Sequence, residues 1–260
     1  MLNKDYTLLS YEYRPLVGEN YRYNVDSEKP FKISRTKIEL FYNCPRCFFK
    51  QIKLGLREPP MPSWAINSAV DALLKKEMDF CRKEDRPHGI FKENKLNIKP
   101  FHHNDIEKWQ NPFTGIQFLD EEHNFLLYGG VDDIMEDENG QLIVIDFKAT
   151  AKAADILSPS NVYNNGAPYK RQLEIYSWLL QKNNFDVSST GYLLYYNGDA
   201  SKDYLGKEMY FRRTLVRFEL DTEWISPMIN DMHACLQEDQ MPSQSEGCEE
   251  CLYLETVSKL

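Results

Sequence analysis

Residues 129–150 read GGVDDIMEDENGQLIVIDFKAT, two apolar runs on either side of an acidic turn that contains Asn139-Gly140. Such runs around an Asn-Gly turn are typical of a β-hairpin. Strand side chains alternate between faces, so Asp146 and Lys148 are expected on one face of the sheet. A three-residue loop, 138–140, would give opposed residues the index sum 278 and set Asp132 against Asp146. A two-residue loop would set Asp132 against Phe147, and we expect the three-residue loop.

Two carboxylates and an ammonium on one face allow two interpretations. The simpler one is a cross-strand salt bridge on a solvated face of the sheet. The other is a site for a hard divalent cation, Mg2+ or Mn2+. In such a site carboxylate oxygens hold the ion, and the lysine orients or deprotonates a water molecule.

The pattern resembles the core of the PD-(D/E)XK nuclease superfamily. The matching features are a glycine three residues before Asp132 and the sequence Asp146-Phe147-Lys148 that follows fourteen residues after Asp132. More narrowly, it resembles the RecB-like branch, which includes the AddAB nuclease domains and the CRISPR-associated adaptation exonucleases. The resemblance implies that Asp132 and Asp146 bind metal, that Phe147 lends its backbone carbonyl, and that Lys148 serves the attacking water.

A helix is expected over residues 169–181, where Gln172 and Tyr176 lie one turn apart. They resemble the Gln-x-x-x-Tyr motif of the family, whose members approach the metal site and the substrate strand. Lys170 and Arg171, at the start of this helix, are candidates for contacts with phosphate.

Two further positions allow a metal or a structural interpretation. On a helix expected from Ser63 to about Glu84, the family often has a histidine where this chain has Asp71. Asp71 is either a further metal ligand or an ordinary exposed helix acid. His102 and His103 are adjacent, so their side chains point apart, and at most one of them is expected to face a given site.

Four of the six cysteines form two C-x-x-C pairs, Cys44-Pro45-Arg46-Cys47 and Cys248-Glu249-Glu250-Cys251. This spacing favours a shared metal site over disulfides, the alternative being four unrelated buried cysteines. It resembles the RecB-like nucleases that carry iron–sulfur clusters, although those usually have one cysteine before the core and three after it. A 4Fe-4S cluster and Zn2+ both remain candidates. The sulfur atoms should lie within about 4 Å of one another around zinc, or about 6–7 Å apart around a cluster.

Composition sets the fold class that we expect. With 260 residues, 42% of them hydrophobic, the chain can bury a sizeable core. We expect an irregular arm over 1–33 and one domain over 34–260, with an insertion at about 86–124. The class is α/β, a mixed central β-sheet flanked by helices, a restriction-endonuclease-like core clipped by a four-cysteine metal site. Neither a membrane span nor an N-terminal signal is evident, so a cytoplasmic location is expected.

The net charge of −9 argues against a nucleic-acid partner, but a nuclease needs only a basic rim around its metal site. We expect a metal-dependent deoxyribonuclease, exonuclease-like on DNA ends or single strands, with protein partners in a repair or defence complex. One alternative is a non-cleaving nucleic-acid-binding or assembly subunit with a structural thiol-metal site. The second is a thiol-metal interaction or redox module in which the acidic face is incidental.

Overall fold

The structure, a computed structural model, describes residues 17–18, 21–56, 65–201, 203 and 206–259. The chain forms two compact units. The thiol unit comprises Met1–Ser27, Leu40–Met61 and Asp231–Leu260, and the sheet unit comprises Glu28–Glu39 and Pro62–Asn230. Most of the arm expected over 1–33, and the helix start expected at Ser63, lie outside the described residues.

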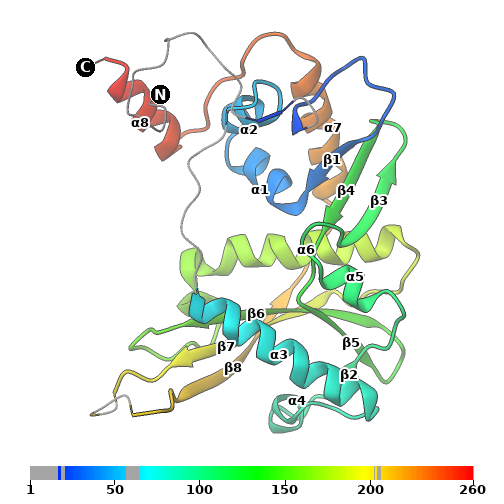
Figure 1. Ribbon diagram of the computed structural model, residues 1–260, viewed down its shortest axis with the longest axis vertical. Coiled ribbons are helices and arrows are strands. Elements are labelled where there is room, and N and C mark those ends of the chain that lie inside the picture. Colours follow the sequence, from blue (N-terminus) through cyan, green and yellow to red (C-terminus); the bar gives the residue numbers. More distant parts are fainter. Residues whose placement is uncertain (1–16, 19–20, 57–64, 202, 204–205, 260) are drawn as a thin grey trace. The chain divides into compact units, whose positions relative to one another are not determined.

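A five-stranded mixed sheet forms the centre of the sheet unit, as the sequence predicted (Figure 1). Strands β6 and β7 are parallel, and the other neighbouring pairs are antiparallel. In spatial order the strands are β2 (Ile98–Pro100), β5 (Asp133–Asp137), β6 (Leu142–Thr150), β7 (Thr190–Gly198) and β8 (Phe211–Glu219).

A second, three-stranded sheet was not predicted from the sequence. Its order is β1 (Phe31–Ser34), β4 (Phe125–Gly129) and β3 (Ile116–Asp120). The helix α6 (Ala167–Lys182) packs against β3 and β4 as well as β6 and β7, so it lies between the two sheets (Figure 1). Two 3-10 turns, η2 (Pro159–Asn161) and η3 (Tyr163–Gly166), lie in the loop that leads to it.

The helix α3 (Ala65–Lys83) covers the other face of the five-stranded sheet, together with α4 (Gly89–Glu93). Leu73 of α3 is exposed, whereas Val70, Leu74 and Met78 are buried in the core. They pack against Ile145 and Phe147 of β6. The short α5 (Ile106–Gln110) lies in the segment that the sequence marked as an insertion.

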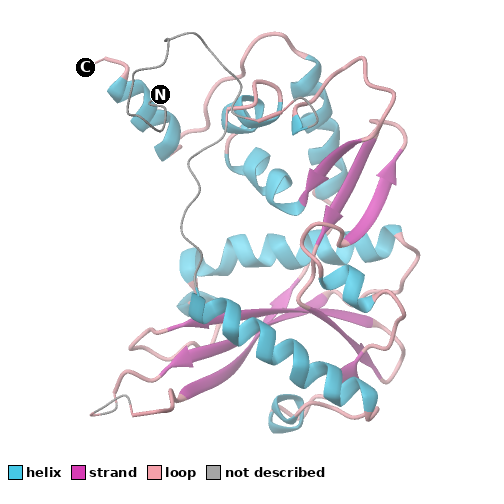
Figure 2. Cartoon of the chain, viewed as in Figure 1, coloured by secondary structure: helices cyan, strands magenta, loops and turns pink. Residues whose placement is uncertain are grey.

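The thiol unit contains α2 (Pro45–Ile52) and α8 (Glu249–Val257). Two helices, α1 (Arg35–Asn43) and α7 (Ile225–Gln237), contain residues of both units. Figure 2 shows the helices of the chain in cyan. The helix α1 ends just before Cys44-Pro45, because proline cannot continue a helix and is tolerated at the start of the next one.

A buried ion pair ties α3 to the sheet. Asp133 is fully buried, and Arg82, whose side chain is 6% exposed, contacts its carboxylate. The Arg82 guanidinium also donates to the carbonyl of Phe101 at 2.7 Å and contacts Asp79. Burial raises the pKa of Asp133 to about 7, although the charge of Arg82 acts in the opposite direction. Because separating two buried charges is costly, the pair fixes the position of α3 relative to β5.

We expect Arg82→Ala to lower the free energy of unfolding by about 3–5 kcal/mol, because it leaves Asp133 buried without a cation. Urea denaturation measures the change. The control is Arg217→Ala, since Arg217 and its partner Glu219 are 62% and 69% exposed. That substitution should cost no more than about 1 kcal/mol. Equal stability of the two variants would contradict a structural role for the buried pair.

Candidate functional site

The β5–β6 hairpin has the register that the sequence predicted. Asp133 pairs with Ile145, and Ile134 pairs with Val144, so the index sum is 278. The loop is 138–140, with Gly140 at a φ of +82°, a conformation that glycine adopts without strain. The side chain of Asp137 accepts hydrogen bonds from the N–H groups of Asn139 and Gln141, both at 2.9 Å, which closes the turn.

Asp132 lies just before β5, at the end of the sheet. Its Oδ2 atom accepts a hydrogen bond from the Phe147 N–H at 2.7 Å. Its backbone carbonyl accepts one from the Gln110 side chain at 3.0 Å, so α5 holds this part of the chain. Burial, and then the charge of Asp146, raise the pKa of Asp132. The two carboxylates are therefore close enough to repel each other.

Asp146 lies in the middle of a polar network and is 1% exposed. The Gln172 amide donates to its Oδ1 atom at 2.7 Å, and the Lys148 ammonium contacts its Oδ2 atom. The Oε1 atom of Gln172 in turn accepts from Lys148 at 3.5 Å. One glutamine thus orients both the acid and the lysine, and the structure brings these three predicted residues together.

Tyr176 continues this network on the next turn of α6. Its hydroxyl group accepts a hydrogen bond from the Gln172 Nε2 atom at 3.2 Å. The tyrosine ring lies against Gly129, where a Cβ atom would come within 2.6 Å of the Tyr176 Cε1 atom. Only glycine therefore fits at that position without moving the ring.

Asp71 is near this network, but a lysine stands between it and Asp132. The Lys75 ammonium lies 3.0 Å from Asp71 Oδ2 and 3.6 Å from Asp132 Oδ1. Burial lowers the pKa of Lys75, but the charges of Asp132 and Asp71 outweigh burial and raise it. Lys75 was not predicted as a site residue, although its position four residues after Asp71 on a helix favours a contact between the two.

Arg35 was also missed, and its surroundings connect it to the same network. It makes no hydrogen bond or ion pair within the described part of the chain. Its Cβ atom would lie 3.4 Å from a Cβ atom added at Gly129, and its charge acts on the Tyr176 hydroxyl group. No pattern in the sequence distinguishes this arginine from others, because its neighbours are brought in by folding.

The other predicted contacts with phosphate or metal are engaged elsewhere. Arg171 forms a bidentate ion pair with the Glu39 carboxylate, with N···O distances of 3.0 Å and 2.6 Å. The Lys170 ammonium lies 3.5 Å from the Glu174 carboxylate. His103 stacks on Trp109 with ring centroids 4.2 Å apart. Its Nδ1 atom accepts from the backbone N–H of Asp105 at 3.1 Å, so this histidine has a structural role.

The two C-x-x-C pairs adopt the same local structure in the thiol unit. Cys44 and Cys248 are the N-cap residues of α2 and α8, and Cys47 and Cys251 lie three residues further, in the first turn. The N-terminal turn of a helix presents free N–H groups and a partial positive charge, which favour a thiolate. Burial raises the pKa of Cys44, but backbone hydrogen bonds from Ser245 and Cys47 outweigh it and lower the pKa to about 6.

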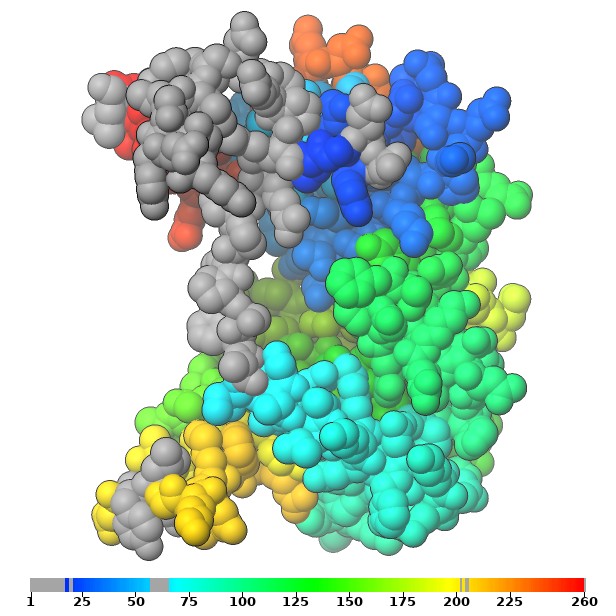
Figure 3. Space-filling view, viewed as in Figure 1, coloured from blue at the N-terminus to red at the C-terminus, as the bar shows by residue number. Residues whose placement is uncertain are grey.

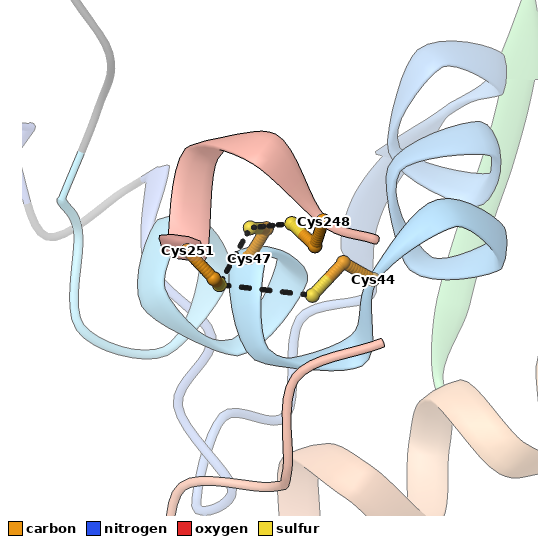
Figure 4. Close-up of side chains that lie close together, drawn as sticks. All are labelled: Cys44, Cys47, Cys248 and Cys251. Carbon is orange, nitrogen blue, oxygen red and sulfur yellow. Dashed lines mark hydrogen bonds between the residues drawn. The ribbon is translucent and has the colours of Figure 1, made fainter. Parts of the chain in front are cut away.

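The four sulfur atoms converge on one point (Figure 4). The Sγ–Sγ distances are 3.9 Å for Cys44–Cys251, 3.6 Å for Cys47–Cys248 and 3.5 Å for Cys47–Cys251. Among the described residues, these cysteines are the one group of three or more cysteine, histidine or acidic residues whose ligand atoms all lie within 4.8 Å of one another. The pairing of the two C-x-x-C sequences is therefore confirmed.

Charged residues around the cysteines connect the two ends of the thiol unit. Lys50 lies 2.7 Å from Glu250, and the charges of Cys47 and Cys251 act on it. Arg46 donates to the Pro242 carbonyl at 3.0 Å and pairs with Glu255 at 3.2 Å. Arg46, which lies between Cys44 and Cys47 in the sequence, thus binds the C-terminal segment that carries Cys248 and Cys251.

Comparisons with known proteins give one family. A family model described as the PD-(D/E)XK nuclease superfamily matches residues 32–256, which include both the carboxylates and the cysteines. A solved structure titled "Crystal structure of SSO0001" is 17% identical, covers 91% of this chain and 90% of its own, and has a TM-score of 0.37. That likeness is too low to support an argument. No curated protein matches the chain. In the described part of the chain, the helices are too short or too polar to cross a membrane.

Proposed function

Because the chain belongs to the PD-(D/E)XK nuclease superfamily, we propose that it is a metal-dependent deoxyribonuclease. The observation that carries this proposal is that Asp146 and Lys148 both contact the side chain of Gln172, while Asp132 accepts from the N–H of Phe147, the residue between them. A cross-strand salt bridge on a solvated face would not need a buried glutamine or a carboxylate that is 1% exposed.

The donor set fits a hard divalent cation. The carboxylates of Asp132 and Asp146 supply oxygen ligands of the kind that Mg2+ and Mn2+ prefer. The N–H of Phe147 donates to Asp132. In a β-strand the N–H and C=O groups of a residue point to the same neighbouring strand, so the Phe147 carbonyl also points toward Asp132. Phe147 thus adds an oxygen ligand. Asp71 belongs to this site as a third carboxylate, whose link to Asp132 passes through the Lys75 ammonium.

Each side chain has a distinct task in hydrolysis of a phosphodiester bond. A divalent cation, when bound, polarises the phosphate and stabilises the charge that develops on it. Asp132 and Asp146 hold that cation, and Gln172 fixes the orientation of Asp146 relative to Lys148. The Lys148 ammonium, 5.0 Å from the centre of the Tyr169 ring, orients the attacking water. Tyr176 and Gln172 position the substrate strand.

The proposed preference for DNA ends or single strands is based on the resemblance to the RecB-like branch. The RecB-like branch, which the Cys-Pro sequence after α1 and the Gln-x-x-x-Tyr motif resemble, supports exonuclease-like action on DNA ends or single strands. It also supports a place in a repair or defence complex with other proteins.

Asp146→Asn should abolish Mg2+-dependent cleavage, and Lys148→Ala should lower the rate by roughly 10²–10⁴-fold, the usual contribution of a group that manages the attacking water. A nuclease assay on single- and double-stranded DNA with Mg2+, Mn2+ or EDTA measures both. Asp155→Asn is the control, because Asp155 is 59% exposed and pairs with Arg212 outside this network.

Binding of DNA without cleavage by the wild-type chain, in either metal, would favour the alternative of a non-cleaving binding or assembly subunit. Wild-type activity of Asp146→Asn would contradict the assignment of the site.

Arg35 is the group best placed to bind a phosphate of the substrate strand. Phosphate contacts are made by arginine and lysine, and most cations near the site, Arg171, Lys75 and Lys148, already contact carboxylates. Among the described residues Arg35 has no such partner; its Cβ atom lies near Gly129, and its charge acts on the Tyr176 hydroxyl group. Arg35 therefore supplies part of the basic rim that a nuclease needs, in a chain whose net charge is −9.

In the cleavage-deficient Asp146→Asn background, Arg35→Ala should weaken DNA binding and lower the slope of log K against log salt by about 1. Fluorescence anisotropy at several salt concentrations measures both quantities. Arg217→Ala, which removes an exposed arginine paired with Glu219, is the control and should leave the slope unchanged. An unchanged slope in Arg35→Ala would exclude a direct contact with phosphate.

For the four cysteines we propose a single structural Zn2+. A tetrahedron of sulfur atoms around one ion, with bonds near 2.3 Å, has edges of about 3.8 Å. The observed Sγ–Sγ distances of 3.5, 3.6 and 3.9 Å support that geometry better than the wider spacing around a 4Fe-4S cluster. Lys50 offsets part of the charge of four thiolates around a divalent ion.

The purified chain should contain one zinc ion and little iron by elemental analysis, and it should lack a broad absorption band in the visible range. Removal of zinc with a chelator should unfold the thiol unit, because the ligands lie at both ends of the chain. Cys47→Ser should have the same effect, whereas Cys81→Ser, at a buried cysteine outside the group, should retain zinc. A brown protein with four irons per chain would overturn the zinc assignment.

A further inference from the structure

The helix α3 has an apolar stripe on its outer side that the proposed function does not use. Ile66, Leu73 and Phe80 recur every seven residues and are 58%, 59% and 54% exposed. Residues seven apart lie almost directly above one another on an α-helix. In Figure 3 this helix, in cyan, lies on the face in view. Asp71 and Lys75 lie half a turn away, on the side of α3 that approaches Asp132.

A cavity opens beside the stripe, between α3 and the start of α4. Its volume is about 420 Å³. It is lined on α3 by Leu73, Lys76, Glu77, Phe80 and Cys81, and beyond α3 by Arg86, His88 and Gly89. The Arg86 guanidinium lies over the Phe80 ring at 5.1 Å, and His88 is 3.0 Å from Glu77. Exposed apolar side chains around a hollow are a feature of protein interaction surfaces.

The order of residues along the stripe indicates what covers it. Between Leu73 and Phe80 the outer face carries Lys76 and Glu77, both exposed. The order of side chains is therefore apolar, positive, negative, apolar. If a second α3 runs antiparallel to the first, each positive side chain faces a negative one and each apolar side chain faces an apolar one. Self-complementarity of this kind is what a two-fold symmetric contact requires.

We propose that α3 pairs in an antiparallel manner with α3 of a second copy of the chain. If opposed residues share the index sum 153, Leu73 faces Phe80 of the second copy, and Lys76 faces its Glu77. Each contact then occurs twice across the two-fold axis. Ile66 of the second copy lies beyond the end of α3, near Arg86 and His88, where the cavity receives it. This inference goes beyond the proposed function and does not depend on it.

Charge reversal in separate copies tests the pairing. Sedimentation equilibrium should give a dimer for the wild-type full chain. Lys76→Glu and Glu77→Lys should each be monomeric, because like charges then face each other twice. An equimolar mixture of the two variants should dimerise again, because glutamates at 76 and 77 of one copy face lysines at 77 and 76 of the other. A stripe that binds an unrelated protein would show no such rescue.

Leu73→Ser probes the apolar part of the same contact and keeps the charges. The substitution acts twice in a symmetric dimer, so the dissociation constant should rise by roughly 100-fold or more. Leu119→Ser is the matched control, since Leu119 is 44% exposed on β3, away from the stripe. Circular dichroism should show that each variant remains folded.

A monomeric wild-type chain at high concentration would overturn the proposal. It would also be overturned if the mixture of charge variants failed to dimerise, or if Leu73→Ser and Leu119→Ser dissociated equally. Nuclease activity is measured separately, and its loss or retention does not bear on the dimer.

Discussion

The register of the β5–β6 hairpin determines the face on which each charged side chain of the carboxylate site lies. Asp133 is the first residue of β5, and Asp132 lies just before it. Asp133 points to α3 and pairs with Arg82, whereas Asp132 turns to β6 and accepts from the Phe147 N–H. A slip of one residue would exchange these roles and leave each carboxylate facing the wrong partner. The three-residue loop at 138–140 excludes that slip.

The second constraint is that a cation lies near each of the three aspartates of the hairpin. Asp146 contacts Lys148, Asp132 lies near Lys75, and Asp133 contacts Arg82. Two of these cations come from α3, at positions seven residues apart, so they lie on the same side of that helix. An unpaired buried charge is costly, and one that is paired and hydrogen-bonded is tolerated. The helix that covers one face of the sheet thus also supplies the charge balance of the site at its end.

The cysteine site depends on the N-termini of two helices, α2 and α8. Each C-x-x-C sequence places one cysteine at the N-cap of a helix and the other in its first turn. The free N–H groups there favour thiolates. A hydrogen bond from the backbone of Ser245, in the C-terminal segment, helps to lower the pKa of Cys44, whereas burial raises the pKa of Cys47 and of Cys251. Arg46 and Lys50 then connect α2 to the C-terminal segment through Pro242, Glu255 and Glu250. The soft thiolate site and the hard carboxylate site differ in chemistry, and they suit different metals.

The sequence by itself determined the features that depend on short spacing. The hairpin and its loop, the helix that carries Gln172 and Tyr176, and the two C-x-x-C pairs follow from periodicity and turn chemistry. Only the tertiary structure decided which distant cations approach the carboxylates. Arg82 and Asp133 are 51 residues apart, and no local pattern shows that Lys75 also approaches Asp132 or that Arg35 lies near Gly129. The three-stranded sheet was missed for the same reason, since β1 pairs with β4 far along the chain. Local patterns specify the elements and the faces that they present, whereas contacts between those faces are set by packing of the whole unit.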